Sequence, residues 1–392
     1  MHNPMSQHGE LKDQDTRFTA VGSVPSEFPF RIEEWEALAQ STAPREAFDY
    51  AAGGSGAEQT MRRNVEAFSR WAILPRTLRD VSDRSTAITL WGQQYAAPVM
   101  LAPIGMQRII HPEGELASSR AAAKHNIPFV TSTVSSYSLE EIAEQMGDRP
   151  RWFQLYWSND REISASMVRR AERAGYSAVV LTVDTILLGW KVRDLRNGYS
   201  PLKLGMGMAN YVADPVFSAK YGQYPEISKE EVVAAILENV YHPSLSFDDI
   251  RFLREQTKLP IAIKGILHPD DAVACIEAGA DAIIVSNHGG RQLDGAAASI
   301  EALPGVVRAV QGRIPVLLDS GVRTGADVIK ALALGASAVF YGRPYLYGLA
   351  VAGEHGVDAV IRNLLSEFDI SLALSGCRTP AELDASILHE VR

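Results

Sequence analysis

The sequence is poor in cysteine, with only Cys275 and Cys377 among its 392 residues. Two cysteines so far apart cannot build the disulfide framework of a small secreted domain, nor the closely spaced ligand pairs of a structural zinc site. We therefore expect no metal site, and the composition favours a reducing compartment.

Long apolar runs are missing as well. No stretch approaches the roughly 18 uncharged apolar residues that a membrane-spanning helix requires. Residues 1–29 are polar and contain no apolar core of a secretory signal, so we expect a loose tail there. These observations predict a cytoplasmic protein without a membrane partner.

The chain also lacks an excess of positive charge, because its formal net charge is -9. An acidic chain has no electrostatic reason to bind nucleic acid or an anionic membrane. With 46% hydrophobic and 22% charged residues, the composition is that of a globular protein with a sizeable core. An anionic ligand would need cations that are gathered locally.

Two nucleotide-binding motifs are absent. No G-x-G-x-x-G follows an apolar strand pattern, and there is no Walker lysine. The cluster Gly53-Gly-Ser-Gly instead follows two helical patterns, at residues 33–40 and 44–52. It predicts the end of a helix in an N-terminal helical segment.

A repeated unit is present, in which an apolar run precedes an amphipathic stretch rich in alanine and glutamate. The eight runs are residues 97–103, 128–133, 152–156, 178–184, 260–264, 282–287, 315–319 and 338–342. Eight strands alternating with helices predict a (β/α)8 TIM barrel, placed in one domain over residues 30–385. The long interval after the fourth strand, about 187–259, is interpreted as an insertion that serves as a lid or subunit contact, with a disordered excursion as the alternative.

Polar residues close most of these runs. They are Ser132, Gln154, Tyr156, Thr182, Asp184, Lys264, Ser286, His288 and Asp319. Catalytic groups of such barrels lie at the carboxyl ends of the strands, and buried ionisable groups are costly unless they are paired or used. The ring of polar residues therefore predicts one functional pocket.

The most informative loop reads Ser286-Asn-His-Gly-Gly-Arg-Gln-Leu-Asp. It places His288, a titratable base, beside the fixed cation of Arg291, which suits proton abstraction from a substrate that carries a carboxylate. A lone histidine or arginine at a strand end is commonly structural. The two glycines between them, however, let a ligand approach the backbone closely, so we expect a small acid as substrate.

The loops after the seventh and eighth runs predict a phosphate site. They read Asp319-Ser-Gly-Val-Arg and Gly342-Arg-Pro, so Arg323 and Arg343 accompany a Gly-rich loop before a helix. A phosphate here, with hydrogen-bonding groups across the barrel mouth, fits flavin mononucleotide (FMN). Lys264 would lie near N1 and the C2 oxygen of the flavin. The alternative role for Lys264 is the Schiff-base amine of a non-redox lyase barrel.

With these residues in hand, the chain resembles the FMN-dependent α-hydroxy-acid oxidases and dehydrogenases. Five segments carry the resemblance: Ser286-Asn-His-Gly-Gly-Arg-Gln, Phe153-Gln-Leu-Tyr, Leu181-Thr-Val-Asp-Thr, Asp319-Ser-Gly-Val-Arg-Thr-Gly and Leu374-Ser-Gly-Cys-Arg. Within the family it is most similar to bacterial lactate 2-monooxygenase and lactate oxidase, through Tyr50-Ala-Ala-Gly-Gly-Ser-Gly, Gly189-Trp and Asn210-Tyr-Val-Ala-Asp-Pro.

The resemblance implies roles for these residues. His288 would be the base, Asp184 would stabilise its imidazolium, and Arg291, Tyr50 and Tyr156 would hold the substrate carboxylate. The implied FMN ligands are Pro103, Ile104, Gly105, Ser132, Gln154, Thr182, Lys264, Ser286, Asp319, Ser320, Gly321, Arg323, Gly342 and Arg343.

Lys191 is a departure from the family pattern. The family usually has an arginine there that helps to bind the substrate carboxylate, and a lysine offers a point charge in place of a planar fork. Arg193 is a candidate substitute, two residues along the same loop.

We expect oxidation of an L-2-hydroxy acid, most simply L-lactate, with O2. If the 2-keto acid is retained, peroxide decarboxylates it to acetate, CO2 and water, as in lactate 2-monooxygenase. If it leaves first, the products are pyruvate and H2O2, as in an oxidase. The long insertion favours the monooxygenase, and the oxidase is the alternative. The resemblance also implies a homo-oligomer, a tetramer or larger.

Overall fold

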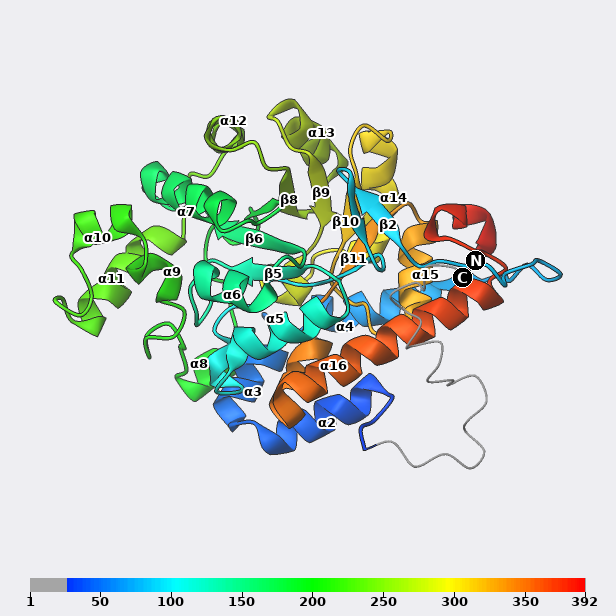
Figure 1. Ribbon diagram of the computed structural model, residues 1–392, viewed down its shortest axis with the longest axis horizontal. Coiled ribbons are helices and arrows are strands. Elements are labelled where there is room, and N and C mark those ends of the chain that lie inside the picture. The colour runs from blue at the N-terminus through cyan, green and yellow to red at the C-terminus, as the bar shows by residue number, and fades with distance from the viewer. Residues whose placement is uncertain (1–26, 392) are drawn as a thin grey trace.

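The computed structural model describes residues 27–391, so most of the expected N-terminal tail lies outside the described residues. Eight parallel strands close a barrel in the order β10-β11-β4-β5-β6-β7-β8-β9 (Figure 1). The strands are β4 (Val99–Leu101), β5 (Phe129–Ser132), β6 (Arg151–Tyr156), β7 (Val179–Thr182), β8 (Ile261–Ile266), β9 (Ala282–Val285), β10 (Val316–Leu318) and β11 (Ala338–Tyr341). Each overlaps one predicted run, which confirms the predicted barrel.

The barrel strands read as continuous apolar runs because both of their faces are buried. Helices cover the outside, and a second cluster fills the inside around Trp152. The hairpin of β2 (Ile88–Leu90) and β3 (Gln93–Tyr95) packs on this inner cluster, with the ring of Trp91 5.3 Å from that of Trp152. One end of the barrel is thereby closed, which leaves the carboxyl ends of the strands for ligands.

Helices follow the strands around the barrel. They are α5 (Gly114–Lys124), α6 (Leu139–Met146), α7 (Arg161–Arg173), α12 (Phe247–Gln256), α13 (Pro269–Glu277), α14 (Ser299–Val310), α15 (Gly325–Ala333) and α16 (Arg343–Leu374). Two short 3-10 turns, η2 (Gln107–Ile109) and η3 (His288–Gly290), follow β4 and β9. Within residues 27–391, no helix is both long and apolar enough to cross a membrane.

The N-terminal segment is helical, as predicted. It contains α2 (Ile32–Thr42), α3 (Arg45–Ala52), α4 (Gln59–Glu66) and η1 (Ala67–Arg70), and α3 ends at the residue before the glycine cluster. The short strand β1 (Trp71–Ile73) pairs antiparallel with β12 (Leu388–Glu390), which lies beyond the expected domain end at residue 385. Between α16 and β12 lie the turns η4 (Pro380–Glu382) and η5 (Ala385–Ile387).

The insertion after β7 folds into helices. Before α12 it contains α8 (Val192–Asn197), α9 (Ala209–Val212), α10 (Pro215–Tyr221) and α11 (Lys229–Val240). Figure 1 shows α10 and α11 at the end of the molecule opposite the C-terminus. The side chain of Asn210 is fully buried and ties α9 to the loop after β5, because its Nδ2 donates to the carbonyls of Ser132 and Thr133, each at 3.0 Å.

Candidate active site

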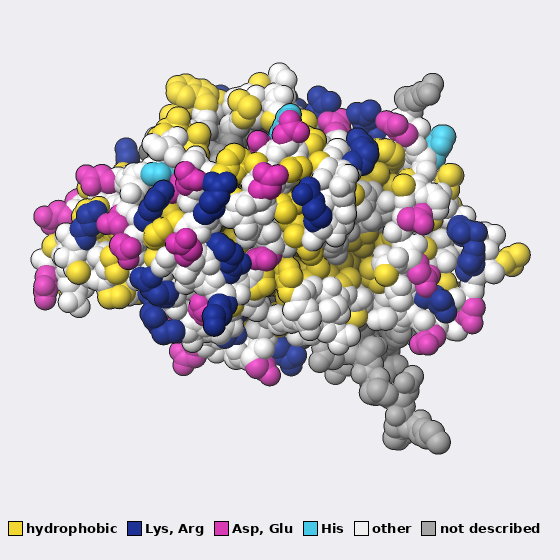
Figure 2. Space-filling view, turned by 90° about the horizontal axis from the view of Figure 1, so that it is seen from above, with side chains coloured by type: hydrophobic (Ala, Val, Ile, Leu, Met, Phe, Trp, Pro, Cys, Tyr) yellow, Lys and Arg dark blue, Asp and Glu magenta, His cyan; other side chains and the backbone are white. Residues whose placement is uncertain are grey.

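A cavity of about 700 Å³ opens at the carboxyl ends of the barrel strands. Its charged lining residues are Lys191, Lys203, Lys264, Arg291, Arg323 and Arg343, against Asp194 and Asp319. Six cations face two carboxylates in a chain of net charge -9, whereas acidic and basic side chains are mixed over the face in Figure 2. The cavity thus gathers the local cations that an anionic ligand requires.

His288 is fixed by contacts on both sides of its ring. Its backbone is left-handed, with φ 58°, and its N–H donates to Ser286 Oγ at 3.0 Å. Nδ1 lies 2.8 Å from Asp184 Oδ1, and Nε2 lies 3.4 Å from the hydroxyl of Tyr156. A strained backbone of this kind persists only where neighbouring contacts hold it, and it is concentrated at functional sites. Because the carboxylate occupies the Nδ1 side, Nε2 is free to accept a proton.

The pKa values of His288 and Asp184 are both lowered, but for different reasons. Burial lowers the pKa of His288, and the charge of Asp184 offsets this only in part. Burial alone would raise the pKa of Asp184, but the positive charges of His288 and Lys264 hold it below its usual value. The pair therefore consists, at neutral pH, of a neutral imidazole and a carboxylate, the state that a general base needs.

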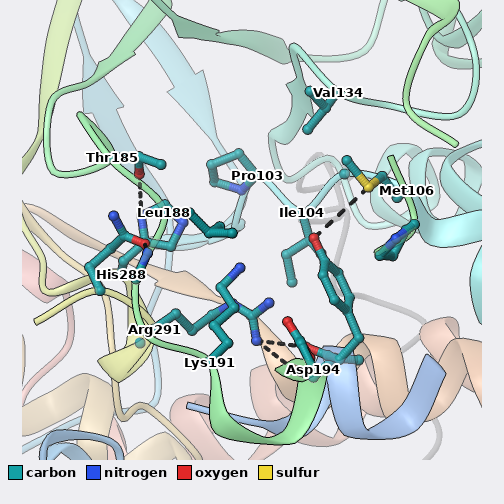
Figure 3. Close-up of a pocket in the computed structure, with 18 of the residues that line it drawn as sticks. Pro103, Ile104, Met106, Val134, Thr185, Leu188, Lys191, Asp194, His288 and Arg291 are labelled. Carbon is teal, nitrogen blue, oxygen red and sulfur yellow. Dashed lines mark hydrogen bonds between the residues drawn. The ribbon is translucent and has the colours of Figure 1, made fainter. Parts of the chain in front are cut away.

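Arg291 and Lys191 flank the ring of Tyr50 in α3. The guanidinium carbon of Arg291 lies 5.1 Å from the ring centroid, and Lys191 Nζ lies 5.2 Å from it. Arg291 Nη1 also donates to the carbonyls of Tyr50 at 2.7 Å and Gly53 at 2.8 Å, which orients the guanidinium. Figure 3 shows Lys191, Arg291 and Asp194 close together in the cavity. Burial raises the pKa of both Tyr50 and Tyr156, so both phenols stay protonated and can donate.

Lys264 forms a buried ion pair. Its Nζ lies 3.0 Å from Asp319 Oδ2 and donates to Ser286 Oγ at 3.0 Å. Burial lowers the pKa of Lys264, but the carboxylates of Asp319 and Asp184 outweigh it and the net shift is upward. A Schiff-base lysine needs a lowered pKa. The geometry therefore disfavours the lyase alternative.

Three polar residues from neighbouring strands bind one another beside the cavity. Ser132 Oγ donates to Gln154 Oε1 at 3.1 Å, and Gln154 Nε2 donates to Thr182 Oγ1 at 3.1 Å. The strand register accounts for the first bond, because Ser132 pairs with Gln154 in the sheet. The second bond is diagonal, because Gln154 pairs with Val180, two residues before Thr182 on β7. These three side chains, with Ser286 and Asp184, are not among the cavity-lining residues.

The two loops predicted to bind phosphate meet at the cavity. Ser320 and Gly321 are left-handed, with φ 74° and 101°, so the chain turns sharply before Arg323. Arg343, at the start of α16, donates to the carbonyls of Ala52, Gly53 and Gly289. In the part of the chain described, neither arginine forms an ion pair with a carboxylate. Burial and the nearby Arg291 lower the pKa of Arg343 to about 10.

Pro103, Ile104, Gly105 and Gly342 complete the same wall of the cavity. At Gly105 an added Cβ would lie 2.5 Å from the carbonyl oxygen of Val134, so only glycine allows this approach of the two loops. The structure thus brings together the residues of the predicted phosphate, lysine and base positions around one cavity.

One candidate was wrong, and two residues were missed. Arg193 does not line the cavity, because it is held by Glu58 Oε2 at 2.8 Å and Asp49 Oδ1 at 3.7 Å. The missed residues are Asp194, which lines the cavity beside Lys191, and Thr185, whose Oγ1 donates to Asp184 Oδ1 at 3.1 Å. The i, i+3 spacing of Lys191 and Asp194 at a helix start was the available signal.

Known proteins resemble this chain in sequence and in fold. The L-lactate oxidase of Lysinibacillus sphaericus is 51% identical, over 89% of this chain and 90% of its own length. The L-lactate oxidase of Nostoc sp. is 43% identical, over 95% of this chain and 100% of its own. A crystal structure of mandelate oxidase superposes with a TM-score of 0.82 at 41% identity, covering 92% of this chain and 98% of that chain.

A sequence model of a whole protein family also matches this chain. The sequence model described as FMN-dependent dehydrogenase matches residues 39–390, which is nearly the whole described chain. The cationic cavity at the carboxyl ends of the barrel strands lies within this range. The chain therefore belongs to the FMN-dependent dehydrogenases, the family of α-hydroxy-acid oxidases and dehydrogenases.

Proposed function

We propose that this protein oxidises an L-2-hydroxy acid, L-lactate in the first place, with bound FMN, and passes the electrons to O2. The observation that carries the proposal is the cavity itself, which is lined by His288, Arg291 and Lys191. Arg323 and Arg343 line the same cavity without carboxylate partners in the described chain, and Arg343 shares the Gly53 carbonyl with Arg291. A base, a carboxylate clamp and a phosphate site together are what a flavin-dependent hydroxy-acid oxidation requires.

The residues present fit FMN. Arg323 and Arg343, buried or half-buried and without an acidic partner in the described chain, supply the charge that a phosphate needs. Lys264 is kept charged by Asp319, so it would place a permanent cation where negative charge develops on the flavin. Residues 103–105 line the cavity and would support the ring. Ser132, Gln154 and Thr182, which bond one another beside the cavity, would have to exchange those bonds to reach the polar edge of the ring. Bound FMN supplies a two-electron acceptor for the hydrogen that leaves the substrate carbon.

The proposed steps of the protein's own residues follow from their contacts. Nε2 of His288 takes the proton of the substrate hydroxyl, and Asp184, 2.8 Å from Nδ1, stabilises the imidazolium that results. Arg291 and Lys191 bind the substrate carboxylate, with the hydroxyls of Tyr50 and Tyr156 as further donors. These contacts hold the hydroxyl against the base.

For the fate of oxygen we propose the oxidase outcome, with release of pyruvate and H2O2. The two lactate-acting relatives named above are both called oxidases. Arg193 is bound by Glu58 and cannot reinforce the grip on the keto-acid carboxylate. Decarboxylation to acetate, CO2 and water, the expected monooxygenase outcome, stays a prediction and is the alternative.

We further propose a homotetramer in the cytoplasm. Apolar side chains around the cavity mouth are exposed in the single chain, with Leu188 58% and Trp190 71% accessible, as is Leu293 at 73%. Exposed apolar residues grouped in this way are typical of a subunit contact. Light scattering of the FMN-loaded protein that gave a monomer of 42.8 kDa would exclude the tetramer.

The central test is anaerobic reduction of the flavin. Mixing the FMN-loaded protein with L-lactate should bleach the flavin absorbance in one phase, D-lactate should not, and His288→Ala should keep FMN but react about 10²- to 10⁴-fold more slowly. If no 2-hydroxy acid reduces the flavin, the proposed function is wrong. Reduction by the His288→Ala variant at the wild-type rate would remove only the role of the base.

A further inference from the structure

Lys191 brings an ammonium group into the cavity without a matched counter-ion. It precedes the first residue of α8, and its Nζ lies 5.2 Å from the ring centroid of Tyr50. Its side chain forms no ion pair within residues 27–391, although its neighbour Arg193 forms two. The cation therefore has a ring face beside it, but no carboxylate in direct contact.

The charges that face Lys191 come from several elements. Arg291, after η3, opposes a positive charge, and Arg343, at the start of α16, opposes it more weakly and only until a phosphate binds there, whereas Asp194 in α8 favours it. Burial opposes the charge most strongly, and the sum lowers the pKa of Lys191 to about 7. Burial raises the pKa of Asp194 from its ordinary value, and its carboxylate forms no ion pair with Lys191 within the described residues. Three cationic groups, Lys191 included, thus face a single carboxylate, so an incoming anion would find an excess of positive charge.

We propose that the substrate carboxylate supplies a balancing negative charge and that Lys191 takes up a proton as the carboxylate binds. A 2-hydroxy acid then enters the cavity together with a proton. An anion placed near an amine favours the charged form, and by linkage the proton favours binding of the anion to the same extent. Arg291 cannot take this part, since a guanidinium stays charged at every accessible pH. The inference rests on the proposed function, because it takes the ligand to be a hydroxy-acid carboxylate.

The coupling has a measurable consequence for affinity. Below pH 7 Lys191 is charged before the ligand arrives, so affinity does not depend on pH through this group. Above pH 7 each bound ligand requires a proton from solution, and the dissociation constant rises up to about tenfold per pH unit. The enzyme thus loses substrate affinity at alkaline pH while the proposed base, His288, stays in its reactive form.

The test uses FMN-loaded protein and 2-hydroxy-2-methylpropanoate, which has the carboxylate and the hydroxyl but no hydrogen on the hydroxyl-bearing carbon, so it cannot be oxidised. Calorimetric titration at pH 8 in two buffers with different ionisation enthalpies gives the protons taken up per ligand. We expect about one for the wild type. Titrations followed by flavin absorbance at several pH values from 6 to 9 give the dissociation constant independently.

Three variants make the test specific to Lys191. Lys191→Arg keeps a permanent charge, so the proton uptake should vanish and the affinity should no longer fall with pH. Lys191→Met should also take up no proton, and should bind more weakly at pH 6. Lys258→Met, at an exposed lysine that does not line the cavity, should behave as the wild type. FMN content confirms that each variant is folded.

Two results would overturn the inference. A wild type whose binding heat does not depend on the buffer takes up no proton, and uptake that persists in Lys191→Arg belongs to another group, such as His288. If L-lactate still reduces the flavin in either case, only this inference fails and the proposed function stands. If no 2-hydroxy acid reduces the flavin and the analogue does not bind, both fail.

Discussion

Asp184 acts on His288 through its negative charge and through its hydrogen bond to Nδ1, and Asp184→Asn alters both. Asp184→Asn removes the carboxylate that raises the pKa of His288, and the amide can donate to Nδ1, which puts the imidazole proton on Nε2. The proposed base is then blocked. We expect flavin reduction by L-lactate to slow by about 10²- to 10⁴-fold in stopped-flow measurements, with FMN content unchanged.

Thr185→Val is the matched control for this prediction. The Thr185 hydroxyl lies 3.1 Å from Asp184 Oδ1 and 3.4 Å from His288 Nδ1, so its loss leaves the 2.8 Å pair in place. We expect less than a tenfold effect. In the wild type the rate of flavin reduction at saturating L-lactate should fall only as the pH drops below the ordinary histidine value of 6.5, because the pKa of His288 is lowered. A limb that lies well above pH 6.5 would contradict the burial argument.

Arg291→Lys tests the carboxylate clamp. A lysine cannot donate to the carbonyls of Tyr50 and Gly53 and face a carboxylate with a planar fork at the same time. We expect the KM for L-lactate to rise about tenfold or more, since a charge-assisted bond is worth about 1.5–3 kcal/mol. FMN retention should not change, whereas Arg323→Lys should show the reverse pattern. Equal losses of FMN in both variants would count against separate sites.

Several of these residues could be chosen from the sequence because their chemistry is unusual where they stand. His288, Lys264 and Asp319 end apolar runs, and a buried ionisable group there needs a reason. Arg193 looked as suitable as Lys191, because sequence does not show which of two neighbours meets an acidic partner. That partner, Glu58, lies on the N-terminal segment, and only the fold brings it to Arg193.

Some secondary-structure elements could be predicted from the sequence and others could not. The barrel strands could be located because burial on both faces demands uninterrupted apolar residues. Helices α9 and α10 were not predicted, because helices of 4 and 7 residues are too short to show a clear helical period of apolar residues. The glycines that precede them in the sequence also indicate a loop. Local signals were nevertheless present: Asp214 accepts from two N–H groups at the start of α10, and Ser228 and Glu231 form a capping box at α11. A search for caps would have found what periodicity missed.

Asn210 is the element-scale test, since it joins the insertion to the barrel. Besides its two bonds to the loop after β5, Nδ2 donates to Ser135 Oγ at 3.0 Å, and Oδ1 accepts from Leu139 N at 2.8 Å. Asn210→Ala leaves these buried groups unsatisfied at a cost of about 2–4 kcal/mol. We expect a melting temperature lower by several degrees, with weaker FMN retention because the loop follows directly on Ser132, the last residue of β5.

Asn197→Ala serves as the comparison. Asn197 lies in the same insertion, but its Nδ2 makes one bond, to Asp49 Oδ2 at 2.8 Å, and it is half-exposed. Its loss should cost about 1 kcal/mol or less. Equal destabilisation by the two variants would mean that Asn210 does not anchor the insertion in the way proposed.

At the scale of the whole molecule, a chain of net charge -9 encloses a cavity whose lining is cationic. Acidic and basic side chains are mixed on the face shown in Figure 2, whereas the cationic lining favours the binding of small anions. The grip of the cavity on an anionic product then decides what becomes of oxygen. In the proposed reaction, peroxide and the 2-keto acid arise in the same cavity, and the product that leaves first decides the outcome.

The prediction is that FMN-loaded protein, L-lactate and air give pyruvate and H2O2 in equal amounts when catalase is left out. The reason is that one permanent guanidinium, Arg291, and one lysine of lowered pKa hold the keto-acid carboxylate, and Arg193 is engaged elsewhere. Lys191→Arg should lengthen the stay of the keto acid, so acetate and CO2 should rise at the expense of pyruvate and H2O2. Acetate and CO2 as the main wild-type products would restore the monooxygenase expectation and show that closure of the insertion, rather than charge, retains the keto acid.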